Sequence, residues 1–420
     1  MTPPQNVSKS GSCSKSGCRE TVVTAGAAGM SVQAKNTPKG EENSMTLKRI
    51  QFIAMITVLL MSFGGIASDG FPGSPLAGMT VYADDTEKTP VKVLILPKFE
   101  IGEAEGDFPG EAQLFYEHYC AGCKELDIPN TTPTAEFYFN EDNGVGLLVT
   151  GSGKTAAGLS LMSLLSFDAY DFSDTIIVSV GCAGGNTGTC IFGDVVLVTA
   201  ACDLELGYHT GSGELADPVH ELTWFPSNDS FGDYSCKLLN AELCDEVYQL
   251  IKDCPLRTTE NTRQVLADNF PDKEWADREP QVMRGTAVTA DSYWKGMEDH
   301  ANAAAAAYYY DCPDSYAVTE MEEIAVMNTA HCFDMQDRVI SLRVVVNLDT
   351  FLKGESPAEL WAADTEDTGF GDKVSEDNSE TLDIFRPGME NLFDAGRIVI
   401  DAILAGELQA SPSGVGLPTN

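Results

Sequence analysis

The sequence predicts an α/β protein, a three-layer sandwich in which a central mixed and twisted sheet is flanked by helices. The first observation is that apolar runs such as 145–149 and 176–180 alternate with stretches of helical periodicity. A strand covered on both faces needs no polar alternation, so these runs indicate central strands. The second observation is that several runs end in glycines or acidic residues. The carboxyl ends of strands are where α/β sheets bind their ligands.

The expected elements follow one another between residues 91 and 404. Strands are expected at 91–96, in a hairpin over 136–149 that turns at Asp142-Asn143-Gly144, and at 176–180, 194–201, 282–290 and 338–348. Helical spacing predicts helices at 154–165, 234–252, 301–309, 319–332 and 389–404. This alternation predicts one large domain over residues 90–410.

A glycine-rich turn stands directly before the first long helix. Glycines allow backbone N–H groups to approach a ligand closely, and the positive end of the helix faces the same place. The loop after the first strand adds one more cation to this region. The expected anion-binding group is therefore Gly151, Ser152, Gly153, Lys154 and Lys98.

The charge of the chain excludes one class of partner. The formal net charge is −38, from 64 acidic and 26 basic residues. Such a surface repels phosphate backbones, so nucleic acid is not an expected partner.

The N-terminal part has the pattern of an export signal. Lys48-Arg49 precede an apolar stretch over 50–66, and small residues follow it. We interpret 45–83 as a secretory signal region, cleaved after Ala67 or after Ala83, which predicts an extracellular or cell-envelope protein. An uncleaved signal anchor is the alternative. Residues 1–44 are expected to be disordered or to precede the true start, and residues 411–420 to form a disordered tail.

The cysteines and histidines lack the spacing of a metal site. Cys120-Ala121-Gly122-Cys123 has no second pair at zinc-like distance, and the five histidines are scattered. No metal ligand is therefore predicted. Ten of the twelve cysteines follow the apolar stretch, and export would allow some of them to form disulfides whose pairing stays open.

Four stretches, taken in order, resemble a known family. They are TGSGKTAAG at 150–158, SVGCAGG at 179–185 followed by Gly193-Asp194, TEMEE at 319–323 and RVVVNLD at 343–349. The sequence resembles the purine nucleoside phosphorylase and uridine phosphorylase superfamily, and within it the purine nucleoside permease branch. Further marks of that branch are VKVLILPKFE at 91–100, GDVVLVTAACDLELGYH at 193–209 and GTAVTADSYWKG at 285–296. The resemblance implies a nucleoside phosphorylase-like sheet with a second, small barrel-like sheet.

The resemblance also implies a purine nucleoside as the ligand and assigns residues to it. Glu322 would accept the ribose hydroxyls while Met321 packs on the sugar, and Asn347 would meet the base edge. Asp349 is the nearest carboxylate that could donate a proton. The remaining substrate-binding candidates are Tyr293 and Trp294, which would stack on the base, and Gly184 and Gly185 of the second glycine run.

Each assignment has a plainer structural explanation. The glutamates of TEMEE would lie in the first turn of a helix, where the helix dipole favours carboxylates whatever the function. Asn347 and Asp349 could simply end a strand, because both residue types favour turns. Tyr293 and Trp294 could be core aromatics.

The function expected is that of an exported purine nucleoside-binding protein, which acts in nucleoside uptake or cleaves the N-glycosidic bond. Phosphate is the one co-substrate considered, and no cofactor is expected. The first loop, Pro97-Lys98-Phe99-Glu100, lacks the arginines with which phosphorylases of the superfamily bind phosphate. Phosphorolysis, hydrolysis and binding without turnover therefore stay open. A membrane transporter and a second copy of the chain are the further partners considered.

Overall fold

The computed structural model describes residues 88–100, 109–209, 224–226, 234–270, 274–352 and 379–409. The predictions for 1–44, for the signal region 45–83 and for the tail 411–420 lie outside these residues. Within the described part of the chain, no helix combines the length and the apolar character that crossing a bilayer requires.

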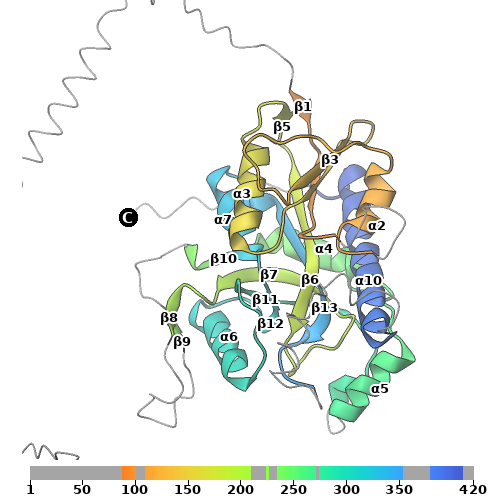
Figure 1. Ribbon diagram of the computed structural model, residues 1–420, viewed down its shortest axis with the longest axis vertical. Helices are drawn as coiled ribbons and strands as arrows, with labels where there is room; N and C mark the ends of the chain where they lie inside the picture. Colours follow the sequence, from red (N-terminus) through yellow and green to blue (C-terminus); the bar gives the residue numbers. More distant parts are fainter. Residues whose placement is uncertain are drawn as a thin grey trace, which may run out of the picture. The chain divides into compact units, whose positions relative to one another are not determined.

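A nine-stranded mixed sheet forms the centre of the described chain (Figure 1). Apolar runs form its central strands, and all four residues of the run 93–96 are buried. The pairing is parallel between β2 and its neighbours β4 and β6, and antiparallel between β3 and β4. The sheet contains β2 (Val93–Leu96), β3 (Glu136–Asn140), β4 (Val145–Val149), β6 (Ile176–Gly185), β7 (Val195–Asp203), β10 (Cys236–Leu238), β11 (Val282–Thr289), β12 (Tyr316–Glu320) and β13 (Val339–Leu348).

Five of these strands close into a ring. β6 pairs with β12, β12 with β11, β11 with β7, β7 with β13, and β13 with β6 again. The long strands β6 and β13 therefore belong both to the open part of the sheet and to this small barrel. Two short pairs lie apart from the large sheet: β1 (Thr89–Pro90) with β5 (Tyr170–Asp171), and β8 (Gly207–His209) with β9 (Trp224–Pro226).

Helices cover the open part of the sheet on two sides, as Figure 1 shows, with α3 and α7 on one side and α10 and α2 on the other. The fold class predicted from the sequence is therefore confirmed. The helical segments are α2 (Gln113–Phe115), η1 (Tyr116–Cys120), α3 (Lys154–Leu165), α4 (Ala241–Ile251), α5 (Glu260–Asn269), η4 (Glu274–Asp277), α6 (Met297–Tyr309), α7 (Glu323–Cys332), η5 (Gln336–Arg338) and α10 (Ser379–Leu404).

Two predicted helices begin later than expected, because a strand occupies their first residues. Residues 236–238 pair with β7, and the Asn240 side chain then accepts the N–H groups of the first turn of α4. Residues 316–320 pair with β11, and α7 begins only at Glu323. Helical spacing was therefore a wrong guide at 234–240 and at 319–322, where sheet pairing decides the conformation.

The strand predicted at 176–180 is longer than expected, because the second glycine run, 181–185, also belongs to it. These residues continue β6 and pair with β13. A Cβ atom on Gly181 would clash with Arg343, and one on Gly184 would clash with Asp349 and Asn347. The glycines thus make room for side chains of the neighbouring strand.

Candidate functional site

A cleft opens at the carboxyl ends of the central strands, between the first loop, the second glycine run and the start of α7. It encloses about 600 Å³, including space open to solvent. Eight of the residues predicted for the site line it: Lys98, Ser152, Gly184, Tyr293, Trp294, Met321, Glu322 and Asn347.

The start of α7 places one of these residues, Glu322, at the wall of the cleft. The carboxylate of Glu320, at the end of β12, accepts the N–H groups of Glu322 and Glu323 at 2.7 and 2.6 Å. It also accepts the Thr289 hydroxyl and so ties β11 to the same turn. These bonds satisfy the free N–H groups of the first turn and place three glutamates at the positive end of α7.

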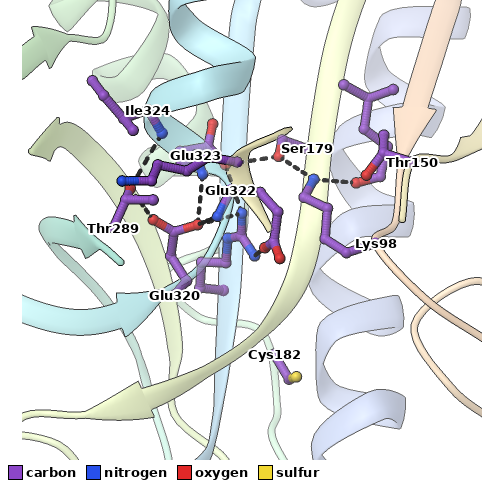
Figure 2. A network of polar contacts seen from close by, with 12 residues as sticks. Lys98, Thr150, Ser179, Cys182, Thr289, Glu320, Glu322, Glu323 and Ile324 are labelled. Atoms are coloured by element: carbon purple, nitrogen blue, oxygen red, sulfur yellow. Dashed lines mark hydrogen bonds and ion pairs between the residues drawn. The ribbon is translucent and has the colours of Figure 1, made fainter. Parts of the chain in front are cut away.

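One buried arginine holds these three carboxylates together. Arg343 of β13 lies 3.0 Å from Glu320, 2.9 Å from Glu323 and 3.5 Å from Glu322. Figure 2 shows Glu320, Glu322 and Glu323 converging on one point. We call these four residues the Arg343 cluster. All four side chains are buried, so the guanidinium replaces the water that would otherwise stabilise the carboxylates.

The pKa of Glu322 is raised within this cluster. Burial raises its pKa to about 7, and the neighbouring Glu320 adds to the rise while Arg343 opposes it. Lys98 shows the reverse effect, because burial and then Arg343 lower its pKa to about 8. The Lys98 ammonium donates to the Leu96 carbonyl at 2.6 Å and to Ser179 at 2.8 Å (Figure 2).

The first glycine turn binds carboxylates of the protein itself. The Gly153 N–H donates to Glu322 at 2.8 Å, and the Lys154 N–H donates to Asp291 at 2.7 Å. The Lys154 ammonium turns toward β7, where it lies 3.1 Å from Asp203 and 2.7 Å from Glu205. Gly151 and Gly153 have φ of 84° and 89°, which favours glycine at both positions.

The opposite wall of the cleft carries the residues predicted for the base. Asn347 lines it, and Asp349 lies behind it, fully buried. Asp349 accepts the Thr319 hydroxyl at 2.8 Å and the Tyr316 hydroxyl. Burial raises the pKa of Asp349 to about 8. The backbone N–H of Asp349 donates to Gly185 at 3.0 Å, so this second glycine holds the end of β13 and does not line the cleft.

The two predicted stacking residues lie in the loop that follows β11. Trp294 is partly buried, whereas Tyr293 is 87% exposed although it reaches the cleft. An exposed aromatic side chain at the mouth of a cleft can cover a flat ligand.

The sequence interpretation missed Glu111, which also lines the cleft. Its two carboxylate oxygens accept the N–H groups of Lys98 and Cys182, each at 2.7 Å. Glu111 is buried and lies beside Arg343. No motif marks it, because it is one of 64 acidic residues and stands far from the glycine runs.

Comparisons with known proteins agree with the family resemblance seen in the sequence motifs. The sequence model of the purine nucleoside permease family matches residues 90–407. A probable purine nucleoside permease of Schizosaccharomyces pombe is 24% identical over 176 residues, which is 38% of this chain and 50% of that protein. The chain thus spans about half the length of this curated relative.

Solved structures with a related fold include two groups. A 5'-methylthioadenosine/S-adenosylhomocysteine nucleosidase of Neisseria meningitidis has a TM-score of 0.43 at 15% identity, covering 74% of this chain and 99% of its own. A futalosine hydrolase of Helicobacter pylori has a TM-score of 0.43 at 10% identity, covering 74% and 97%. The family match over residues 90–407 takes in every element from β2 to α10 that builds the cleft, and by this match the chain belongs to the purine nucleoside permease family.

Proposed function

We propose that the protein binds a purine ribonucleoside in the cleft and cleaves its N-glycosidic bond with water. The observation that carries this proposal is the state of the cations around the cleft. Lys98, Lys154 and Arg343 are each bound to oxygen atoms of the protein. A phosphate dianion would have to displace these partners, and a buried anion without a cation is costly.

The helix terminus predicted to bind an anion supports the same conclusion. The N–H groups of Gly153 and Lys154 donate to Glu322 and Asp291. A phosphate at this place would meet two carboxylates and be repelled by them. Water, which is neutral, has no such barrier.

Different carboxylates bind the sugar and the water in this proposal. Glu322 is oriented by the Gly153 N–H and can accept the ribose hydroxyls beside Met321. Glu320 is occupied by Thr289, Arg343 and two backbone N–H groups. Glu111 accepts one backbone N–H group on each carboxylate oxygen and lines the cleft, and we assign to it the orientation of the attacking water.

The base leaves from the wall formed by β12 and β13. As the bond breaks, the purine gains negative charge, which a proton or a hydrogen bond must stabilise. Asn347, Tyr293 and Trp294 line the cleft, and we assign the Asn347 amide to the base edge and the two aromatic side chains to the face of the base. In its protonated form Asp349 donates to the Thr319 oxygen, which reverses the hydrogen bond between them, and Thr319, which lines the cleft, passes its own hydroxyl proton to the base.

The first prediction concerns the nucleophile. The rate of inosine cleavage is expected to be independent of phosphate, because Lys98, Lys154 and Arg343 are already paired. The measurement is a rate series in rising phosphate at constant ionic strength, with free ribose and ribose 1-phosphate assayed separately. A rate that starts at zero, saturates with phosphate and yields ribose 1-phosphate would contradict hydrolysis.

The second prediction concerns the sugar. Glu322→Ala is expected to weaken ribonucleoside binding or turnover by about 2–4 kcal/mol, the loss typical of a charged hydrogen-bond acceptor. The matched control is the 2'-deoxyribonucleoside. The wild type should prefer the ribonucleoside, and the variant should lose most of this preference. If the folded variant keeps the full preference, Glu322 does not bind the hydroxyls.

A nucleoside-binding role in uptake is the second candidate, and the description of the family as a permease favours it. Measurable nucleoside binding without any release of free base would select this role.

From the sequence alone we also propose export, with a signal within 45–67 or 45–83. Mass spectrometry of the mature N-terminus tests this point.

A further inference from the structure

Three cysteines from distant parts of the chain meet beside the carboxyl end of β7. Cys202 is the last residue but one of β7, Cys236 begins β10, and Cys312 lies between α6 and β12. Their Sγ atoms are 2.9 Å (Cys202 to Cys236), 3.4 Å (Cys202 to Cys312) and 3.8 Å (Cys236 to Cys312) apart. We call these three residues the thiol cluster. Its members are 34 and 76 residues apart in the sequence, so no local spacing reveals it.

The dimensions of the cluster fit a thiolate-bound cation. Zinc binds thiolate sulfur at about 2.3 Å, which places neighbouring sulfurs of a tetrahedron about 3.8 Å apart. The Cys236–Cys312 pair lies at this spacing, whereas the Cys202–Cys312 and Cys202–Cys236 pairs, at 3.4 and 2.9 Å, would have to open to reach it. Three thiolates are a soft ligand set, which selects zinc or the cuprous ion over hard cations such as magnesium.

The cluster is partly open to solvent. Cys202 is buried, whereas Cys236 and Cys312 are partly exposed, so a water molecule can reach a fourth coordination position.

A disulfide is the competing use of these residues. Cys202 and Cys236 are direct partners in the antiparallel pair of β7 and β10. The flanking pairs, 203 with 235 and 199 with 239, carry the backbone hydrogen bonds. This makes Cys202 and Cys236 a non-hydrogen-bonded pair, whose usual Cα separation of about 4.5 Å suits a disulfide. However, such a bond would leave the Cys312 thiol in contact with it and unused, whereas a cation uses all three sulfurs.

We propose that Cys202, Cys236 and Cys312 bind one thiophilic d¹⁰ cation, zinc or the cuprous ion, as a clip that joins β7, β10 and the segment before β12. The clip adjoins the nucleoside cleft without lining it. Asp203 follows Cys202 directly and pairs with Lys154, the first residue of α3. The clip therefore fixes the end of β7, and the Asp203–Lys154 ion pair at that end holds the first glycine turn.

The test uses the full chain, purified under a phosphine reductant and freed of metal. It is titrated with Zn²⁺ against a chromophoric zinc chelator and, in a parallel anaerobic series, with Cu⁺ against a cuprous chelator. We expect one equivalent of one of these cations per chain. The melting temperature should rise with the concentration of that cation.

Two variants locate the site. Cys312→Ser is expected to lose the bound equivalent and the thermal shift, whereas Cys332→Ser, which changes an exposed cysteine outside the cluster, is expected to keep both. Peptide mapping of protein alkylated directly in native cells gives a readout that does not depend on any variant. A Cys202–Cys236 disulfide in that map overturns the proposal. Failure of the reduced wild type to bind either cation, or unchanged binding by Cys312→Ser, also overturns it.

Discussion

Replacing Arg343 by methionine is expected to destabilise the protein by about 3–5 kcal/mol, the usual cost of removing one partner of a buried ion pair. Methionine fills much of the same space but leaves Glu320, Glu322 and Glu323 buried without the guanidinium that holds them. The free energy of unfolding, measured by denaturant titration at pH 8, checks this value.

A second arginine provides the control. Arg263 pairs with Glu279 at 2.6 Å, but both side chains are exposed. Arg263→Met should therefore change the stability by less than about 1 kcal/mol. If the two variants lose the same small amount, the Arg343 cluster does not stabilise the fold in the way described.

The pH dependence of the Arg343→Met loss has a definite sign. Arg343 lowers the pKa values of Glu322 and Glu323, so both rise when the cation is removed, and the folded variant then binds protons that the unfolded chain does not. This stabilisation is present at low pH and is lost as the pH rises through the raised pKa values. The difference in stability between wild type and variant should therefore be larger at pH 8 than at pH 5. A difference that grows toward low pH would contradict the cluster.

Much of the fold could be predicted because local rules and tertiary packing agree there. Helix α3 begins and ends at the predicted residues, since Gly153 with positive φ sets its start. The hairpin of β3 and β4 turns where Asn143 and Gly144 favour a turn. The prediction failed at 234–240 and 319–322, where residues with helical spacing pair with a strand that lies far away in the sequence.

The residues of the site divide in the same way: local motifs indicate some of them, and long-range contacts determine the others. Motifs found Glu322, Asn347 and Asp349 because each stands at the end of a recognisable element. Motifs could not show that Arg343 binds Glu320, Glu322 and Glu323, because that contact depends on the register of β13 against β6. Glu111 was missed for the same reason, since its position is set by its bonds to the N–H groups of Lys98 and Cys182.

The proposed mechanism uses two groups with shifted pKa values, Glu322 and Asp349, in opposite protonation states. Glu322, with a pKa of about 7, must be ionised to accept the ribose hydroxyls. Asp349, with a pKa of about 8, must be protonated to supply the leaving base. The rate should therefore rise through about pH 7 and fall above about pH 8, as a narrow bell.

Asp349→Asn tests the falling side of this bell. The variant cannot donate the proton, so kcat is expected to fall about 10²- to 10⁴-fold, and the loss of rate above pH 8 is expected to disappear.

A measurement of stability separates this catalytic role of Asp349 from a structural one. A folded-state pKa raised to about 8 means that the stability linked to Asp349 is complete below about pH 4 and is lost as the pH rises through 8. Because asparagine stays neutral, the variant should hold its stability between pH 7 and 9 better than the wild type does. A variant that keeps full kcat, or that keeps the falling limb, would show that the leaving base takes its proton from another group.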